Sequence, residues 1–525
     1  MAQWTGFELN LTGIELLLPD GIRADAAVDA LSTRVPIEEG PGAERDLRFY
    51  DTFDGLLHGA GLAFVHASGR SALVSLEDGS ERAAITAPEP PGRLLANELE
   101  PGGMREALST VIESRALLPL VHIHSAERTF GVLDGSEKTV VRLVLDEPAV
   151  VVSANRRIRL APRIRVAAVR GYDKALKRVH ETLLDDVGLT AADRSVLDEA
   201  VIATGGKPEG VSSKVDVALA RDQRSDSAAA SILRRLAEIM ESNLPGVIAD
   251  VDTEFLHDYR VAVRRSRAVM RELKGVFPAE QLARFRVELR WLQQVTGPAR
   301  DLDVYVLDFD ELRSGLPEAS RDDLEPLLRV LRDHRVIAHR EMVRALRSDR
   351  AAELRAQWPA FLTGLVGLPV DGRRGAVLPI GELAGERITK VYRRMVKDGR
   401  VIDDSSPPEA LHELRKKGKE LRYLLELFGL PLHPGDVVKP LVRSLKSLQD
   451  TLGRHQDREV QIATLRSFRD EVSTLRGGAA ALMAMGVLIE HLGEDEHAAR
   501  AEFAEVFASF ASKSQRALVK EAFSA

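Results

Sequence analysis

The C-terminal part of the chain is an internal duplication, and this constrains its fold more than any other feature. Residues 254–267, EFLHDYRVAVRRSR, align with residues 409–422, EALHELRKKGKELR, at a constant offset of 155. Residues 292–304, LQQVTGPARDLDV, align with residues 448–460, LQDTLGRHQDREV, at an offset of 156. Two matched blocks at nearly the same offset are hard to obtain by chance, and they indicate that one structural unit occurs twice.

The duplicated region has the pattern of amphipathic helices. From about residue 226 onward apolar residues recur with the helical period, and the pattern breaks at stretches rich in Gly and Pro. Helices joined by short connections are buried most simply as a bundle. We therefore predict an all-α domain of two duplicated four-helix bundles over residues 226–525, with repeats at about 226–365 and 377–515.

The N-terminal region has a different pattern. Up to about residue 170 it consists of short apolar or alternating runs separated by Gly, Pro, Asp and Ser, which is typical of strands. The 525 residues exceed what one hydrophobic core usually supports. We expect a multidomain protein with an N-terminal α+β, β-rich domain at 1–202 and a linker at 203–225, which contains ATGGKPEGVSSK.

Composition limits the class of protein. With no cysteine the chain has no disulfides and no thiolate chemistry, which suits a reducing compartment. No apolar run approaches the roughly 18 residues that cross a bilayer, and the first residues lack the pattern of a signal peptide. We expect a cytoplasmic protein that does not contact membranes, and the abundance of Ala, Arg, Leu and Val is typical of a bacterial source.

Each copy of the repeat carries a row of basic residues on one helix face. At 100° per residue, one row falls within an arc of about 80°; this first stripe is His257, Arg260, Arg264, Arg267 and Arg271. The second stripe repeats the pattern with His412, Arg415, Lys419 and Arg422. The opposite side of both helices is apolar, so each helix is predicted to have a packed face and a basic face.

The two stripes have two interpretations. A charged face of an amphipathic helix is most often simply exposed to solvent. Such a face normally mixes acids with bases, because like charges one turn apart repel. Here Asp258, Glu413 and Glu420 fall outside the arcs, and only Glu426 falls inside. This pattern, present twice, favours binding of an extended anion.

The histidines that begin the stripes also have two interpretations. Each can be a capping or packing residue, or can donate a hydrogen bond to an anion when protonated. Their equivalent positions in the two copies favour the second role. A metal site is not expected, because neither His257 nor His412 has a partner at His-x3-His or HExxH spacing.

Other cations outside the stripes form matched pairs. Arg290 and Lys446 precede the two Leu-Gln blocks, and Arg235 matches Lys390 in the helix before each histidine. Lys390 begins the basic segment KVYRRMVK (390–397). These residues either extend the anion-binding surface or are ordinary solubilising charges.

The repeat and its stripes resemble the CHAD family, a helical domain named for its histidines. The resemblance covers about residues 226–515 and rests on LHDYRVAVRRSR, LHELRKKGKELRYLLELF and the paired LQ…G…D…V blocks. It implies two four-helix bundles with pseudo-two-fold symmetry and a basic central surface that binds inorganic polyphosphate, without catalytic residues, cofactor or metal. The contact residues that it implies are His257, Arg260, Arg264, Arg267, His412, Arg415, Lys419 and Arg422, with Arg290 and Lys446 as neighbours.

The N-terminal region is similar to the CYTH, or triphosphate-tunnel, fold that often precedes CHAD. RFYDTFDGLLHGAGLAFVHASG (48–69) carries the resemblance, and RTFGVLDGSEKTVVRLVLD (128–146) is a weaker match. CYTH enzymes need an acidic ExExK start, a run of arginines and a later acidic strand to hold metal and triphosphate. The departures here are Glu8 and Glu15 without ExExK, Val65 and His66 in place of arginine, and Arg163 and Arg165 in place of carboxylates.

These features predict a polyphosphate-binding protein with a degenerate, non-catalytic CYTH-like domain. Association with polyphosphate granules is a further expectation. Metal-dependent triphosphate hydrolysis is the alternative enzyme function, and the departures from the motif weigh against it. Nucleic-acid binding is a third hypothesis, which is weakened because Tyr423 is the nearest aromatic residue on which a base could stack. The sequence does not indicate the oligomeric state, the preferred polyphosphate length or a protein partner.

Overall fold

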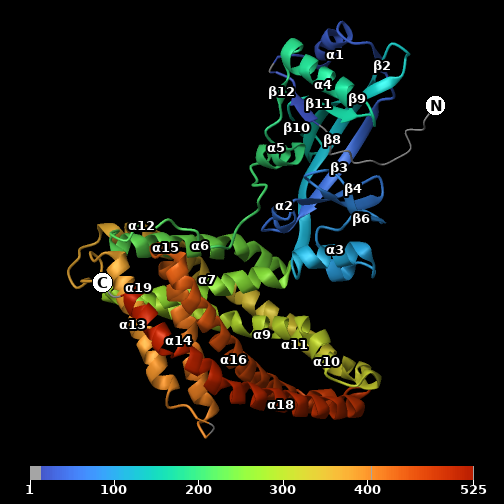
Figure 1. The fold of residues 1–525 in the computed structure, drawn as a ribbon. Helices are drawn as coiled ribbons and strands as arrows, with labels where there is room; N and C mark the ends of the chain where they lie inside the picture. Colours follow the sequence, from blue (N-terminus) through green and yellow to red (C-terminus); the bar gives the residue numbers. More distant parts are fainter. Residues whose placement is uncertain (1–13, 20, 404, 524–525) are drawn as a thin grey trace. The chain divides into compact units, whose positions relative to one another are not determined.

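The computed structural model describes residues 14–19, 21–403 and 405–523. The chain divides into two compact units, with the boundary between Ser213 and Lys214. The predicted fold class is confirmed: the N-terminal unit is built on an antiparallel sheet and the C-terminal unit is helical (Figure 1). Glu8 lies outside the described residues.

An antiparallel sheet of twelve strands organises the described part of the N-terminal unit. Its strands are β1 (Ile14–Leu17), β2 (Ile37–Glu39), β3 (Ala43–Asp51), β4 (Leu62–Ala67), β5 (Arg70–Ser75), β6 (Glu81–Thr86), β7 (Leu94–Leu95), β8 (Ala116–Leu133), β9 (Thr139–Ser153), β10 (Arg156–Arg159), β11 (Arg163–Ala168) and β12 (Thr190–Ala191). The main path runs β12-β1-β11-β9-β8-β3-β4-β5-β6, while β10 pairs with β9, and β2 and β7 pair with β8.

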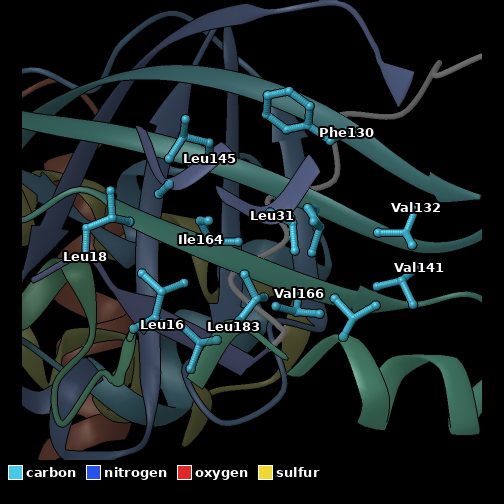
Figure 2. Packing of buried hydrophobic residues seen from close by; sticks show 14 of the residues in the cluster. Leu16, Leu18, Leu31, Phe130, Val132, Val141, Leu145, Ile164, Val166 and Leu183 are labelled. Atoms are coloured by element: carbon cyan, nitrogen blue, oxygen red, sulfur yellow. The ribbon is translucent and has the colours of Figure 1, made fainter. Parts of the chain in front are cut away.

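Helices cover the sheet and close its hydrophobic cores. They are α1 (Ala24–Ser32), α2 (Leu56–Gly59), α3 (Gly103–Ile112), α4 (Asp173–Glu181) and α5 (Val196–Ala203), with short turns η1 (Ala96–Glu98) and η2 (Thr182–Asp186). Figure 2 shows one core, in which Leu31 of α1 and Leu183 of η2 pack with strand residues such as Phe130, Ile164 and Val166. A second core places Val196 and Leu197 of α5 against β3, β4, β5 and β8.

Strands β8 and β9 are longer than the sequence pattern predicts. The polar stretch around Ser125 and Glu127 has the composition of a turn, yet β8 continues through it. The reason is that these side chains are satisfied within the sheet: the Ser125 hydroxyl donates to Asp146 at 2.8 Å, and Glu127 binds Arg165. A pattern based on hydropathy alone cannot distinguish such internally paired polar residues from a turn.

The C-terminal unit contains the duplicated helices. The first copy comprises α6 (Ser225–Ala249), α7 (Thr253–Glu272), η3 (Lys274–Val276), α8 (Ala279–Val295), α9 (Gly297–Leu307), α10 (Phe309–Ser314), η4 (Glu318–Ser320), η5 (Asp322–Leu324), α11 (Glu325–Leu346), α12 (Asp349–Gly364) and η6 (Leu365–Gly367). The second comprises α13 (Ile380–Gly399), α14 (Pro408–Leu424), η7 (Leu425–Gly429), α15 (Leu430–Leu432), α16 (Gly435–Ser467), α17 (Arg469–Ser473), α18 (Gly478–Phe510) and α19 (Lys513–Phe523). Residues 204–224 form neither helix nor strand.

The two copies correspond element by element. α6, α7, α8 with α9, and α11 match α13, α14, α16 and α18, which gives the four expected long helical segments in each copy. Each copy adds a shorter helix, α12 or α19, that packs on the first helix of its own copy. Pro298 lies at the start of α9 and separates it from α8, whereas Arg454 at the equivalent position lets α16 continue unbroken.

Reciprocal backbone contacts show the pseudo-two-fold relation between the copies. The Ser225 amide donates to the Leu378 carbonyl at 2.9 Å, and the Ile380 amide donates to the Gln223 carbonyl at 2.8 Å. The two donors, Ser225 and Ile380, are 155 residues apart, and so are the two acceptors, Gln223 and Leu378. Each copy therefore donates the equivalent hydrogen bond to the other copy. This is the contact pattern that a two-fold axis imposes on two identical surfaces.

Candidate functional site

The helices that carry the two stripes pack against each other. α7 begins at a capped end, where the Asp252 carboxylate accepts from the amides of Glu254 and Phe255. Its apolar side, which includes Phe255 and Val263, is buried, and α14 likewise buries Leu414 and Leu421. Because α7 contacts α14, the two packed faces hold the stripes within one unit.

Two ion pairs join α7 to α14 across the repeats. Arg265 pairs with Glu426 at 2.7 Å, and Arg271 pairs with Glu420 at 3.0 Å. Position 265 is equivalent to 420, and position 271 to 426, so the two pairs are again reciprocal. Glu420 and Glu426 therefore link the two helices, and Glu426 also pairs with Arg422 at 2.6 Å.

Arg264 and Lys419 occupy equivalent positions in the two stripes and lie near each other. The pKa of Lys419 is lowered to about 8, first by desolvation and then by repulsion from Arg415 and Arg264. The Lys419 side chain as a whole is exposed, so neighbouring atoms crowd its ammonium while solvent still reaches it. Neither Arg264 nor Lys419 forms an ion pair within the described residues. The structure thus leaves two like charges from different repeats close together.

The histidines are held by equivalent residues of the second repeat block. Arg300 donates from Nη2 to Nδ1 of His257 at 2.9 Å, and Nδ1 of His412 is hydrogen-bonded to Oε1 of Gln456. Arg300 and Gln456 are separated by the offset of 156. Because a guanidinium only donates, Nδ1 of His257 must accept, and its ring proton is on Nε2.

Arg260 lies in the interior rather than on the surface. Its side chain is 8% exposed, and Nη1 donates to the Gln293 carbonyl and the Thr296 hydroxyl, both at 2.9 Å. Burial lowers the pKa of Arg260 to about 10, with further repulsion from Arg264 and Arg300. Arg260 therefore fixes the end of α8 next to the stripe.

Arg267 and Arg415 of the stripes already have partners within the protein. Arg267 donates to Oε1 of Gln293, and burial lowers its pKa. Arg415 pairs with Asp457 at 2.9 Å, although 60% of the Asp457 side chain is exposed. The first stripe has an equivalent acid, Asp301. Desolvation raises its pKa above the ordinary value, although the nearby Arg260, Arg300 and Arg264 oppose this shift. Part of the basic surface is thus already balanced by carboxylates.

Comparisons with known proteins decide the family of this unit. The CHAD domain model matches residues 231–466. Residues 231–466 form a CHAD domain. The CHAD family is associated in general with polyphosphate binding.

Two relatives and two solved structures are similar to the chain. Uncharacterized proteins Rv2226 and MT2285 of Mycobacterium tuberculosis strains H37Rv and CDC 1551 are each 30% identical over 207 residues, 38% of this chain and 38% of their own length. The CHAD domain from the plant Ricinus communis is 22% identical with a TM-score of 0.47, covering 57% of this chain and 96% of that one. PptA from Streptomyces chartreusis is 20% identical with a TM-score of 0.42, covering 54% and 99%.

The matched pairs outside the stripes separate into two groups in the CHAD domain. Arg290 on α8 and Lys446 on α16 are exposed and form no ion pair within the described residues. Arg235 on α6 instead donates to the Lys214 carbonyl at 3.2 Å and pairs with Glu238 at 3.3 Å. Lys390 on α13 lines a cavity with residues of α13 and α19. Within the part of the chain that the structure describes, no hydrogen bond or ion pair joins Arg235 or Lys390 to the stripes.

Sequence reasoning missed three kinds of residue in the CHAD domain. Arg300 and Gln456 hold the histidines, Asp301 and Asp457 face the stripes, and Arg265 with Glu426 joins the two copies. The first four lie in the second repeat block, at equivalent positions, so the alignment of the two copies could have drawn attention to them. Arg265 gives no such signal, because position 420 carries the opposite charge.

The N-terminal unit is consistent with a CYTH-like fold, but its interior does not fit a metal-bound triphosphate. Arg163 is 0% exposed and pairs with Glu15 at 3.2 Å and Glu199 at 2.6 Å. Arg165 pairs with Glu127 and, at 3.7 Å, with Asp146. Cations and carboxylates that a triphosphate site would need are therefore bound to one another. No group of three His, Cys, Asp or Glu residues among those described is arranged to hold a metal.

No helix within the described ranges is long and apolar enough to span a membrane.

Proposed function

We propose that the CHAD domain binds inorganic polyphosphate across the two stripes. The observation that carries the proposal is the proximity of Arg264 and Lys419, equivalent cations from the two repeats that form no ion pair within the described residues. Like charges held together raise the energy of the ligand-free surface, and an anion lying between them relieves that repulsion. A polymer with a negative charge on every unit is suited to contact both at once.

The surrounding residues have different proposed roles. Arg264, Lys419, Arg290 and Lys446 present cations to the polymer, and each contact is a charge-assisted hydrogen bond. His257 offers its Nε2 proton. Arg415 and Arg422 first have to exchange a carboxylate for phosphate. Arg260 is a positioning residue, because its guanidinium donates hydrogen bonds to Gln293 and Thr296 inside the protein. Arg267 and His412 have the proposed role of contacting the polymer in addition to their internal partners.

Charge reversal of one residue from each repeat tests the proposal. Arg264→Glu with Lys419→Glu in the full chain should weaken binding of long-chain polyphosphate by about a hundredfold or more, because each charged hydrogen bond contributes roughly 1.5–3 kcal/mol. Arg329→Glu with Arg332→Glu, two exposed residues of α11, makes the same change of net charge elsewhere. Equal affinity of the two double variants would show that only net charge matters and would overturn the proposal.

The alternatives receive less support. We propose no hydrolysis by the N-terminal unit, since its interior arginines are paired with carboxylates. Nucleic-acid binding is separated from polyphosphate binding by competition at fixed salt, where the proposal expects single-stranded RNA to be displaced by polyphosphate at equal phosphate concentration. Association with polyphosphate granules in the cytoplasm would follow from the binding and is tested by imaging the same double variant in cells.

A further inference from the structure

The second repeat contains a cavity whose charged lining residues are all cationic. It lies between α13 and α19 and has a volume of about 530 Å³. Its cations are Arg393, Lys397, Arg400, Arg516 and Lys520. None of them forms an ion pair with a carboxylate within the described residues. Nε of Arg516 donates a long hydrogen bond to the Ser512 carbonyl at 3.4 Å.

The same cavity wall has an apolar part. Val396 and Val519 come from the facing sides of α13 and α19, and Val401, 76% exposed, lies at the rim. The Thr389 hydroxyl is buried in the wall and has no hydrogen-bond partner among the described residues. Small-molecule sites commonly combine an apolar wall with a few polar groups in about 300–1,000 Å³.

The first repeat provides an internal comparison, because α6 and α12, together with Tyr259 of α7 and Leu289 and Leu292 of α8, line a cavity of about 570 Å³. Its charged lining is mixed: Arg234 and Arg355 lie beside Glu238 and Glu241. α6 matches α13 at the offset of 155. α12 matches α19 through their serine caps, since Ser348 accepts from the Ala351 amide and Ser512 from the Gln515 amide. At the five equivalent positions the first repeat has Glu238, Ser242, Pro245, Ala352 and Ala356.

The cation cluster is therefore not a property of the duplicated scaffold. Equivalent helices line a cavity in both repeats, but the first has both acids and bases in its lining, whereas the second has Arg or Lys at five positions where the first has an acid and four uncharged residues. Nor is it part of the stripes, which lie on α7 and α14, because the cavity is lined by α13, α19 and the segment that follows α13. The cations face a recess rather than a flat surface, which suits a compact ligand more than a long polymer.

We propose that this cavity binds a small phosphorylated molecule with an apolar body, of the nucleoside triphosphate class, independently of the stripes. The guanidinium and ammonium groups contact the phosphates through charge-assisted hydrogen bonds. The exposed side chain of Val401 packs against the base or sugar, above a floor formed by the largely buried Val396 and Val519. This proposal differs from polyphosphate binding, because the cavity would recognise the apolar body of the ligand as well as its phosphates.

Calorimetric titration of the full chain with ATP tests the site. The unmodified protein binds ATP, and Arg393→Glu with Arg516→Glu weakens that binding about tenfold or more, as expected for the loss of two charged contacts. Arg393→Gln with Arg516→Gln also weakens ATP binding, and it removes the two charges without introducing acids. Thermal unfolding verifies that each variant is folded. The matched control, Arg329→Glu with Arg332→Glu, retains the affinity.

Two further arms separate this site from the stripes. Arg264→Glu with Lys419→Glu leaves ATP affinity unchanged, and saturating long-chain polyphosphate does not displace ATP. Tripolyphosphate, which has the phosphates without the apolar body, binds the cavity more weakly than ATP. Absence of ATP binding by the unmodified chain, equal binding by the cavity variants, or loss of ATP binding in the stripe variant would overturn the proposal.

Discussion

Lys419 is a stripe residue whose charge depends strongly on its surroundings. Desolvation and the nearby guanidinium groups of Arg415 and Arg264 lower its pKa to about 8 from an ordinary 10.5, and Arg422 adds to this repulsion while Asp457 opposes it. The unfolded chain therefore holds this proton more tightly than the folded one. Between about pH 8 and 10.5 this difference makes the free energy of unfolding rise with pH when no ligand is bound.

Polyphosphate affinity should therefore fall as pH rises through about 8, because Lys419 loses its charge well before an ordinary lysine. Binding near pH 8 should also take up protons, since a bound anion raises the pKa of the ammonium. Titrations at pH 7 and 9, in buffers with different ionisation enthalpies, measure both effects. Lys419→Arg keeps the charge over this range and should flatten the pH dependence; an unchanged profile in that variant would contradict the assignment.

In the N-terminal unit, the charge of Arg163 is balanced by its neighbours. This arginine is fully buried, and its guanidinium pairs with the carboxylates of Glu15 and Glu199. Removing one partner of such a pair leaves carboxylates without a counter-charge, which costs about 3–5 kcal/mol. Arg163→Met should lower the free energy of unfolding of this unit by that amount, measured by chemical denaturation. Arg157→Met, on the exposed strand β10, is the control and should change it little. Similar losses in both variants would mean that Arg163 is not specially placed.

At the scale of single residues, the sequence predicted which cations share a helix face but not their burial. Arg260 and Arg264 lie one turn apart in the same arc, yet Arg260 is bonded to the end of α8, 33 to 36 residues away in sequence. The period of one helix contains no information about which other element packs beside it. For the same reason the sequence could not show that the carboxylates of Asp301 and Asp457 lie near the stripes, although the alignment of the two copies marks these acids as equivalent.

At the scale of elements, close packing of helices depends on particular glycines. Gly399 ends α13, and a Cβ built there would lie 2.1 Å from the ring of Phe507 on α18. Gly486, in the middle of α18, has no atom within 4 Å of such a Cβ. The two positions therefore differ in packing although both are helical.

The prediction is that Gly399→Ala destabilises the CHAD domain by about 1–3 kcal/mol, because the Phe507 ring has to move. Gly486→Ala should instead stabilise it by about 1 kcal/mol, because alanine is the better helix former. Chemical denaturation of the two variants measures both signs. Stabilisation by Gly399→Ala would show that α13 and α18 are not packed as described.

The helices and their boundaries followed largely from the sequence, because the apolar period and the Gly and Pro residues act locally. Pro298, one of the prolines at which the helical pattern breaks, lies at the start of α9. The strands were less predictable: β8 and β9 pass through polar residues whose partners lie on other strands. The prediction of four helices per copy left out α12 and α19. Each of them packs on the first helix of its own copy, α6 or α13, which lies far away in sequence.

At the scale of the whole CHAD domain, the duplication does more than repeat a fold. The reciprocal pairs Arg265–Glu426 and Arg271–Glu420 hold α7 against α14, and this contact places Arg264 near Lys419. The repeat offset could be read from the sequence. That the two copies pack with their basic helices together could not, because nothing in one copy specifies how it meets the other.

The central claim is that one polyphosphate chain contacts both repeats at once. Calorimetric stoichiometry with polyphosphate of one uniform length, long enough to reach both stripes, tests it most directly. We predict a single binding event per CHAD domain, weakened to a similar degree by Arg264→Glu alone and by Lys419→Glu alone. Two independent binding events, each abolished by only one of these substitutions, would contradict the account.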